Sequence, residues 1–286
     1  MSSPNVHLHK MKSAKEIVEM AIAKGGAVGA FNVILLEHAE ALIAGAEAAQ
    51  LPVILQISEN AVKYHGALKP IGLATLTLAE LADVPVSVHL DHAEDENLVA
   101  QALDLGFDSV MFDGSKLEYR DNVQASLRMS TLCKSYGATI EVELGKVGGK
   151  DGVHAPGVRT DPIEASKFVA ETGVDLLAVA VGSSHAMTTR NAELDFELIT
   201  QLASSVPVPL VLHGSSGVSD QDLQSAVRAG MRKINIATHL NHVFTDAIRA
   251  VLEEDLKLVD PRKYVGAGRS AIAGEAARLL KLLALI

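Results

Sequence analysis

The sequence predicts an α/β fold, a single (β/α)8 or TIM barrel domain over residues 1–286. Three observations support this prediction. Short apolar runs alternate with longer segments of helical spacing, the pattern of parallel βαβ units. There are eight such runs, and four of them follow a glycine that can end the preceding helix. The length of 286 residues also suits one barrel. A doubly wound open sheet is the alternative.

The expected elements follow in order along the chain. Ser13 to Lys24 predicts an amphipathic helix, with Ser13 and Glu16 as a capping box, that closes the barrel floor. Successive strands begin 23 to 37 residues apart, which leaves room for one strand and one helix each time. The eight expected strands are Val28–Val33, Val53–Ser58, Val86–Asp91, Ser109–Gly114, Thr139–Gly145, Leu176–Gly182, Pro209–Ser215 and Lys233–Thr238.

Charge and composition exclude several classes of function. The chain has 25 basic and 35 acidic side chains, a net charge of −10, and no run of Lys or Arg. Nucleic acids and membrane surfaces are therefore not expected partners. The single cysteine, Cys133, cannot form an internal disulfide, and no stretch reaches the ~18 apolar residues that span a bilayer. We expect a globular, cytoplasmic protein.

Three histidines stand at the expected carboxyl ends of strands, where barrel enzymes place their reactive groups. His92, His185 and His213 belong to the third, sixth and seventh strands or follow them directly. Three imidazoles would bind a catalytic Zn²⁺ and leave one position open for substrate. Asp91, directly before His92, either orients a ligand or acts as a general base.

Other polar side chains share these strand ends. Asp113 and Glu143 are enough for a second cation position or for holding the histidine rings. Glu141 is two residues before Glu143 and shares its strand face, but it lies deeper, so we expect it to be structural. Asn32 and Ser58 end the first and second strands and are expected to contact substrate.

The loops after the last two strands predict a phosphate site, as is usual in such barrels. Gly214, Ser215 and Ser216 offer N–H and hydroxyl donors, and a helix that begins near Ser219 adds its positive end. The segment 235–238 would close the other side. Residues 145–162, with five glycines, are typical of a mobile lid, although an ordinary connection is the alternative.

These motifs resemble the class II, metal-dependent ketose-bisphosphate aldolases, the family of fructose- and tagatose-bisphosphate aldolases. The resemblance runs from about Gly29 to Tyr264 and rests on the motifs FNV, VHLDHAED, SVMFDGS, EVELG, TDPIEA, LAVAVGSSH, VPLVLHGSSGV, INIAT and DPRKY. It implies reversible cleavage of a ketose 1,6-bisphosphate to dihydroxyacetone phosphate and an aldehyde, glyceraldehyde 3-phosphate, through a Zn²⁺-stabilised enediolate.

The resemblance also implies roles for individual residues and a homo-oligomer, a dimer or tetramer. His92, His185 and His213 match the Zn²⁺ ligands, and Asp91 matches the residue that transfers the proton. Asp113 and Glu143 match a second or alternative metal position. A monovalent cation, Na⁺ or K⁺, is expected near the first phosphate, and Arg269 is the candidate for the far phosphate. The residues expected to contact substrate are Asn32, Ser58, Gly182, Gly214, Ser215, Ser216, Asn235, Ile236, Ala237, Thr238 and Arg269.

The chain departs from the family pattern at several places. Ala186 replaces a Gly that often follows the second zinc histidine. The lid lacks the usual glutamate after its paired glycines and has Asp151 as the candidate acid. The motif NIATHLN is closer to the tagatose type than to the fructose type. The preferred sugar therefore stays open.

The sequence leaves four other functions to compare with this one. One is an aldolase for a related, non-bisphosphorylated ketose phosphate, and another is a metal-dependent barrel hydrolase. A Schiff-base aldolase needs a lysine that projects toward substrate, and Lys233 stands at the start of the eighth expected strand, the wrong end. A non-catalytic sugar-phosphate-binding protein would have no need for Asp91.

Overall fold

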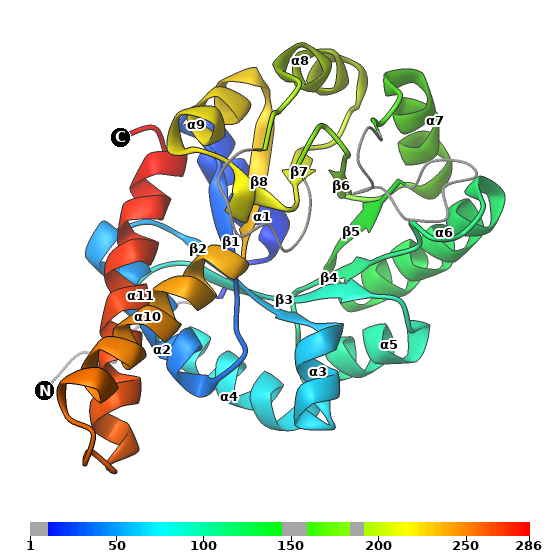
Figure 1. Cartoon of the computed structure of the whole chain (residues 1–286). Helices are drawn as coiled ribbons and strands as arrows, with labels where there is room; N and C mark the ends of the chain where they lie inside the picture. The colour runs from blue at the N-terminus through cyan, green and yellow to red at the C-terminus, as the bar shows by residue number, and fades with distance from the viewer. Residues whose placement is uncertain (1–10, 145–158, 184–191) are drawn as a thin grey trace, which may run out of the picture.

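The computed structural model describes residues 11–144, 159–183 and 192–286, and it has the expected closed barrel (Figure 1). Eight parallel strands follow one another in chain order, and the first pairs with the last through Val28–Phe31 and Lys233–Ile236. The strands are β1 Val28–Asn32, β2 Val53–Ser58, β3 Val86–Ala93, β4 Ser109–Phe112, β5 Thr139–Glu143, β6 Leu176–Ala178, β7 Leu210–Leu212 and β8 Met231–Ile236.

Helices surround the barrel and connect successive strands (Figure 1). Five of them, α2, α3, α5, α6 and α7, end next to a residue in the left-handed conformation, which is a glycine in every case except α2. The predicted glycine junctions after α5, α6 and α7 are therefore confirmed. The helices are α1 Ala14–Ala23, α2 Leu36–Ala49, α3 Glu59–His65, α4 Leu68–Leu81, α5 Glu96–Leu105, α6 Tyr119–Tyr136, α7 Pro162–Thr172, α8 Phe196–Ser205, α9 Asp220–Ala229, α10 Thr238–Glu254 and α11 Pro261–Leu283, with a 3₁₀ turn η1 Ser215–Gly217.

The predicted strand positions are confirmed, but several strand lengths were wrong. β6 ends at Ala178 and β7 at Leu212, earlier than expected, because the apolar sequence continues beyond the strand. Val179 and Val181 are buried without belonging to a strand. Apolar runs report burial rather than hydrogen bonding, so they overstate strand length. β8 begins earlier than expected, at Met231, which places Lys233 inside the strand.

Helix α1 closes the barrel floor, as predicted. The Ser13 hydroxyl accepts a hydrogen bond from the Glu16 N–H, and the Glu16 carboxylate accepts one from the Ser13 N–H, so the capping box is present. Ile17 and Val18 are fully buried against residues at the bottom of the barrel, such as Ile54. Burial of these side chains fixes α1 across the end opposite the functional one.

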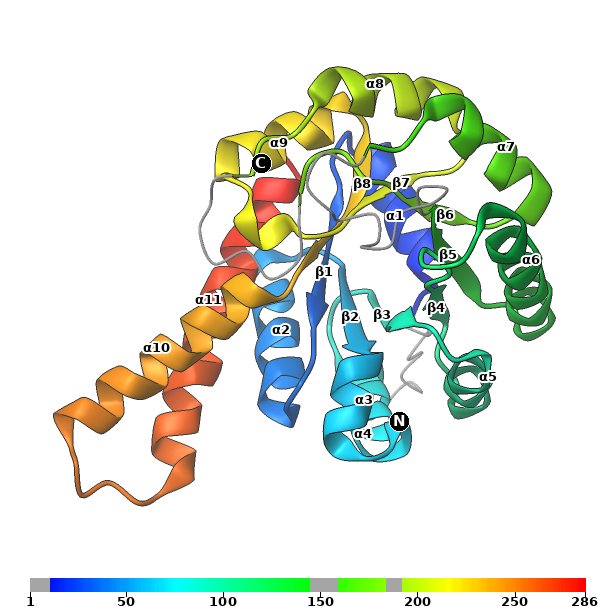
Figure 2. The ribbon, with the colours of Figure 1, turned by 45° about the vertical axis from the view of Figure 1, so that its right-hand side comes forward.

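The last two helices, α10 and α11, form a hairpin that extends beyond the barrel (Figure 2). Its base is close-packed, since a Cβ on Gly268 would overlap the ring of Phe244, and one on Gly45 of α2 would meet the carbonyl oxygen of Ala273. Its tip carries Leu256 and Val259, which are 88% and 87% exposed. None of the helices in the described ranges is both long and apolar enough to cross a membrane.

Candidate functional site

A cavity of about 540 Å³ opens at the carboxyl ends of the strands. Twelve of the predicted site residues line it, and they belong to β1, β2, β3, β4, β7 and β8 or follow these strands. They are Asn32, Ser58, Asp91, His92, Asp113, His213, Gly214, Ser215, Ser216, Asn235, Ala237 and Thr238. The chain therefore brings most of the predicted site together at one end of the barrel.

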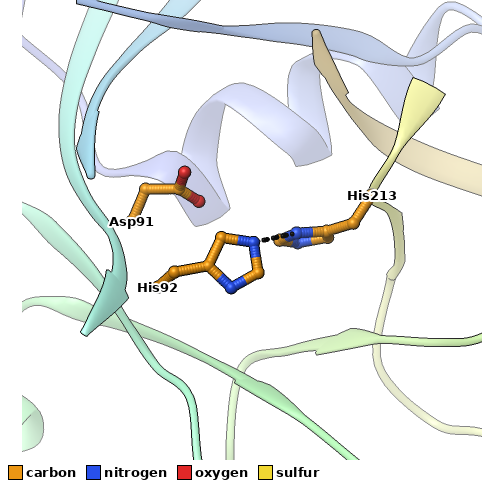
Figure 3. A group of neighbouring side chains, drawn as sticks. All are labelled: Asp91, His92 and His213. Atoms are coloured by element: carbon orange, nitrogen blue, oxygen red, sulfur yellow. Dashed lines mark hydrogen bonds between the residues drawn. The ribbon is translucent and has the colours of Figure 1, made fainter. Parts of the chain in front are cut away.

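Asp91 and His92 both face this cavity although they are neighbours in β3 (Figure 3). Adjacent strand residues normally point to opposite faces of the sheet. Here the pairing of β3 with β4 shifts between Leu90 and Ala93, and His92 has a left-handed backbone with φ 49°. Such an irregularity re-aims a side chain. The distortion of the strand thus turns both side chains toward the same cavity.

His92 and His213 both line the cavity, and their rings face each other (Figure 3). His92 Nε2 lies 2.9 Å from His213 Nδ1, and Asp91 supplies a carboxylate oxygen to the same group, in which all ligand atoms lie within 4.8 Å of one another. The second nitrogen of each ring is also engaged: His92 Nδ1 lies 2.7 Å from Asp113 Oδ2, and His213 Nε2 lies 2.9 Å from Glu141 Oε1. Each ring therefore donates to a carboxylate and directs its other nitrogen to a shared point.

The carboxylates around His92 shift its ionisation. Burial opposes a charged imidazole, but Asp91, Asp113 and Glu143 outweigh it and raise the pKa of His92 to about 10. Although burial acts against it, the hydrogen bond from His92 lowers the pKa of Asp113. His92, Asp113 and Glu143 form a second group of converging ligand atoms. Negative charge is thus concentrated where a cation would bind.

Asp91 is buried in a polar surrounding. It is 3% exposed, and burial raises the pKa of its carboxyl group despite the opposing effect of His92. Its oxygens accept hydrogen bonds at 3.4 Å from the amide groups of Asn32 and Asn235. Gln56 in turn donates to Asn32 Oδ1 at 2.6 Å. The carboxylate is therefore held in place and disposed to accept a proton.

The predicted phosphate loop forms one wall of the cavity. Gly214 has a left-handed backbone, φ 66° and ψ 22°, and leads into η1. The Ser216 hydroxyl oxygen accepts a hydrogen bond from the His239 N–H at 3.1 Å, which joins this loop to the start of α10. Ser219 caps α9, as the predicted helix start near this residue requires. Backbone N–H groups in such a turn suit an anion.

Three predicted substrate contacts lie apart from the described cavity lining. Gly182 has φ 123° and is packed so closely against the carbonyl of Glu193 that a Cβ would not fit. Ile236 is buried in the barrel wall. Arg269, on α11, pairs with Glu40 at 2.7 Å. His185, Ala186, Asp151 and most of the predicted lid fall outside the described residues.

Several side chains that line the cavity were not predicted from the sequence as site residues. The cavity is also lined by polar residues of β2, α3 and the loops after β3 and β4: Gln56, Glu59, Asn60, Lys63, Glu94, Ser115 and Lys116. Glu141, expected to be structural, contacts His213 directly. Strand alternation places Glu141 and Glu143 on one face, but it does not identify His213 as the partner of Glu141. No sequence motif marks the α3 residues that follow β2 as part of the cavity lining.

Comparisons with known proteins agree with this geometry. The family described as fructose-bisphosphate aldolase class-II matches residues 12–285. The chain is 38% identical to the fructose-bisphosphate aldolase of Geobacillus stearothermophilus over 264 residues, 91% of this chain and 92% of that one. It is 38% identical to a probable fructose-bisphosphate aldolase of Bacillus subtilis, covering 91% and 93%.

A solved structure extends this likeness to three dimensions. The crystal structure of the YdjI aldolase from Escherichia coli K12 superimposes with a TM-score of 0.84 at 30% sequence identity, covering 96% of this chain and 97% of that one. Sequence, fold and the converging side chains at the barrel mouth agree. The chain belongs to the class II fructose-bisphosphate aldolase family.

Proposed function

We propose that this protein is a metal-dependent aldolase that reversibly cleaves a ketose 1,6-bisphosphate to dihydroxyacetone phosphate and glyceraldehyde 3-phosphate. One observation carries the proposal. The pair His92–His213 and the buried carboxylate of Asp91 converge in a cavity whose wall is the Gly214–Ser216 loop. A pair of metal ligands, a group that carries the proton and a loop that binds phosphate are the three parts that this reaction needs.

The donor set fits a zinc ion. One nitrogen of His92 and one of His213 face a common point, and the other nitrogen of each ring contacts a carboxylate. This arrangement is typical of histidines that bind zinc. We assign the ligands as His92, His213 and His185, the last of which lies outside the described residues. When bound, Zn²⁺ supplies Lewis-acid polarisation of the substrate ketone. Asp113 and Glu143 would hold a second or alternative cation.

Asp91 is assigned the proton transfer. When the bond between C3 and C4 of the ketose breaks, its electron pair passes to the ketone half and the C4 hydroxyl loses a proton. The Asp91 carboxylate accepts this proton, because burial raises its pKa and favours the protonated form. Asn32 and Asn235 hold the carboxylate toward the cavity during the transfer.

The phosphate of the dihydroxyacetone half is assigned to the loops after β7 and β8. Gly214, Ser215 and Ser216 provide donors on one side, and Ala237 and Thr238 lie on the other. The positive end of α10, which begins at Thr238, favours an anion there. A monovalent cation, Na⁺ or K⁺, beside this phosphate is part of the proposal.

One observation favours the alternative substrate, a ketose with a single phosphate. Across the barrel mouth from the phosphate loops, the described cavity lining has two lysines, and both are neutralised: Lys63 pairs with Glu59 at 2.7 Å and Lys116 with Glu94 at 2.6 Å. Arg269 stays a prediction for the far phosphate, although its partner here is Glu40.

We also propose an oligomeric state, a domain organisation and a location for this protein. The chain forms a dimer or tetramer, which the exposed Leu256 and Val259 at the hairpin tip support. Residues 1–286 form one domain, which the packing of α1 on the barrel and of α11 on α2 supports. The protein works in the cytoplasm, in keeping with its single, buried and free Cys133.

Aldol cleavage of fructose 1,6-bisphosphate and tagatose 1,6-bisphosphate, followed by release of dihydroxyacetone phosphate, tests the function. We expect EDTA to abolish cleavage and Zn²⁺ to restore it, and the ratio of the two rates identifies the sugar. The corresponding ketose 1-phosphates form a second arm. Cleavage that persists in EDTA contradicts the metal mechanism, whereas zinc-loaded protein that cleaves none of these sugars points to hydrolysis instead.

A further inference from the structure

A lysine lies inside the barrel, directly beneath the candidate metal site. The Lys233 side chain on β8 is 0% exposed, and its Nζ atom lies 2.8 Å from Glu141 Oε2. The same ammonium group donates to Asn235 Oδ1 at 2.9 Å. A buried ion pair loses the hydration of both charges and often stabilises a fold no better than apolar side chains would. Its presence here therefore calls for an explanation beyond stability.

The first link runs through Glu141 to the metal ligand. Glu141 is also 0% exposed, and its Oε1 atom accepts a hydrogen bond from His213 Nε2 at 2.9 Å. A carboxylate can only accept, so His213 carries its proton on Nε2, and Nδ1 has the lone pair that can bind the metal. Lys233 balances the charge of Glu141 and lets this carboxylate stand in the barrel interior.

The second link runs through Asn235 to the proton carrier. An ammonium group can only donate, so its contact fixes which end of the Asn235 amide is the oxygen. The amide nitrogen then lies 3.4 Å from Asp91 Oδ1 and 3.2 Å from His213 Nε2. Because His213 Nε2 already carries a proton, the amide donates to Asp91 rather than to that nitrogen. Lys233 thus sets Asn235 as a donor to Asp91.

We propose that Lys233 is a positioning residue that sets both the metal-facing nitrogen of His213 and the hydrogen bond to Asp91. The inference rests on the proposed function, in which His213 binds the metal and Asp91 moves the proton. It also gives Lys233 a role other than the Schiff-base nucleophile of a metal-free aldolase. Its Nζ atom faces Glu141 and Asn235, and the residue is absent from the described cavity lining.

The test uses the full-length protein and two variants. Lys233→Met removes the cation but leaves Glu141 charged and buried, which threatens folding. Lys233→Met combined with Glu141→Gln keeps the interior neutral and preserves an amide oxygen for His213. The matched control is Arg232→Met, because Arg232 is adjacent on β8, points to the opposite face and bonds the carbonyls of Val227 and Met231.

The primary readout is metal binding to protein stripped of its metal. Chelator competition gives the dissociation constant for Zn²⁺, and visible absorption of the Co²⁺-loaded protein reports the ligand geometry. We expect the double variant to fold, to bind Zn²⁺ about 10- to 100-fold more weakly than the wild type, and to give a changed Co²⁺ spectrum. The Arg232→Met control should match the wild type in both.

Two results would overturn the inference. A folded double variant with wild-type Zn²⁺ affinity and a wild-type Co²⁺ spectrum would reduce Lys233 to a space-filling residue. Borohydride trapping of a substrate adduct on Lys233 in the wild type would make it a nucleophile. A wild-type protein that is fully active in EDTA would instead remove the proposed function itself, so the two failures are distinguishable.

Discussion

The imidazole rings of His92 and His213 stand almost perpendicular, with centroids 4.6 Å apart and an interplanar angle of 82°. Their facing nitrogens are 2.9 Å apart, and the outer nitrogens are bound to Asp113 and Glu141. Two rings held in this way from β3 and β7 are preorganised to share one ion rather than to stack on each other.

Replacement of His213 by Ala should therefore abolish bound zinc and reduce aldol cleavage to background. The fold should survive, because Glu141 keeps Lys233 as its partner when the imidazole is lost. Metal analysis after gel filtration, cleavage assays and circular dichroism measure the three quantities. His65→Ala is the control, since His65 bonds the carbonyl of Ile34 and does not belong to the described cavity lining. An active, zinc-free His213 variant contradicts the mechanism.

Zinc binding should also release a proton. In the metal-free protein the surrounding carboxylates raise the pKa of His92 to about 10, so this ring is charged at neutral pH. A metal ligand must be deprotonated, and binding at pH 7 to 9 should expel about one proton and strengthen roughly tenfold per pH unit. Calorimetry in two buffers with different ionisation enthalpies counts the protons. Binding without proton uptake by the buffer speaks against His92 as a ligand.

Replacement of Asp91 by Asn should separate proton transfer from metal binding. The amide has the same shape as the carboxylate but cannot accept the substrate proton, so kcat should fall by ~10²- to 10⁴-fold while zinc is retained. Asp108→Asn is a control at a partly buried carboxyl group on the barrel floor, away from the cavity. A near-normal kcat in the Asp91 variant means that another group carries the proton.

Replacement of Gly214 by Ala should weaken phosphate binding. The left-handed backbone at Gly214 costs a residue with a side chain about 1–2 kcal/mol, so the loop would relax and move its N–H groups. We expect KM to rise by about tenfold. Gly137→Ala bears the same backbone cost at the end of α6, where a Cβ meets no atom within 4 Å. This control should lower the stability of the protein and leave KM unchanged. Equal KM values in both variants would mean that the Gly214–Ser216 loop does not bind the substrate phosphate.

The sequence predicts the barrel because the signal for each βα unit is local. Each unit shows an apolar run, an amphipathic segment and often a glycine, such as Gly106 or Gly137, within a short stretch of chain. The structure confirms the predicted order of elements and the helix on the barrel floor. Strand ends are less predictable, because apolar residues such as Val179 remain buried after the β6 hydrogen bonds end.

Partners within the site are harder to predict, because they depend on contacts across the barrel. Strand alternation places Glu141 on the inner face but cannot reveal that it meets both His213 of β7 and Lys233 of β8. The position of Lys233 was misjudged for a related reason: β8 starts at Met231, and a long side chain reaches up the barrel from its middle. Such pairs become visible only when the barrel is closed.

Asp108 carries a partly buried carboxyl group on the barrel floor. Burial raises its pKa to about 7, although hydrogen bonds from the Ser87 hydroxyl and the Val88 N–H act in the opposite direction. The folded protein therefore keeps this proton up to about pH 7, whereas the unfolded chain releases it near pH 3.8. Between these values the folded state binds more protons, so the free energy of unfolding falls as pH rises. Each pKa unit is worth about 1.4 kcal/mol.

Asp108→Asn, which cannot ionise, should show a smaller fall than the wild type when both are unfolded by urea in EDTA between pH 4.5 and 8. Parallel curves for the two proteins would mean that Asp108 is ionised in the folded state throughout this range.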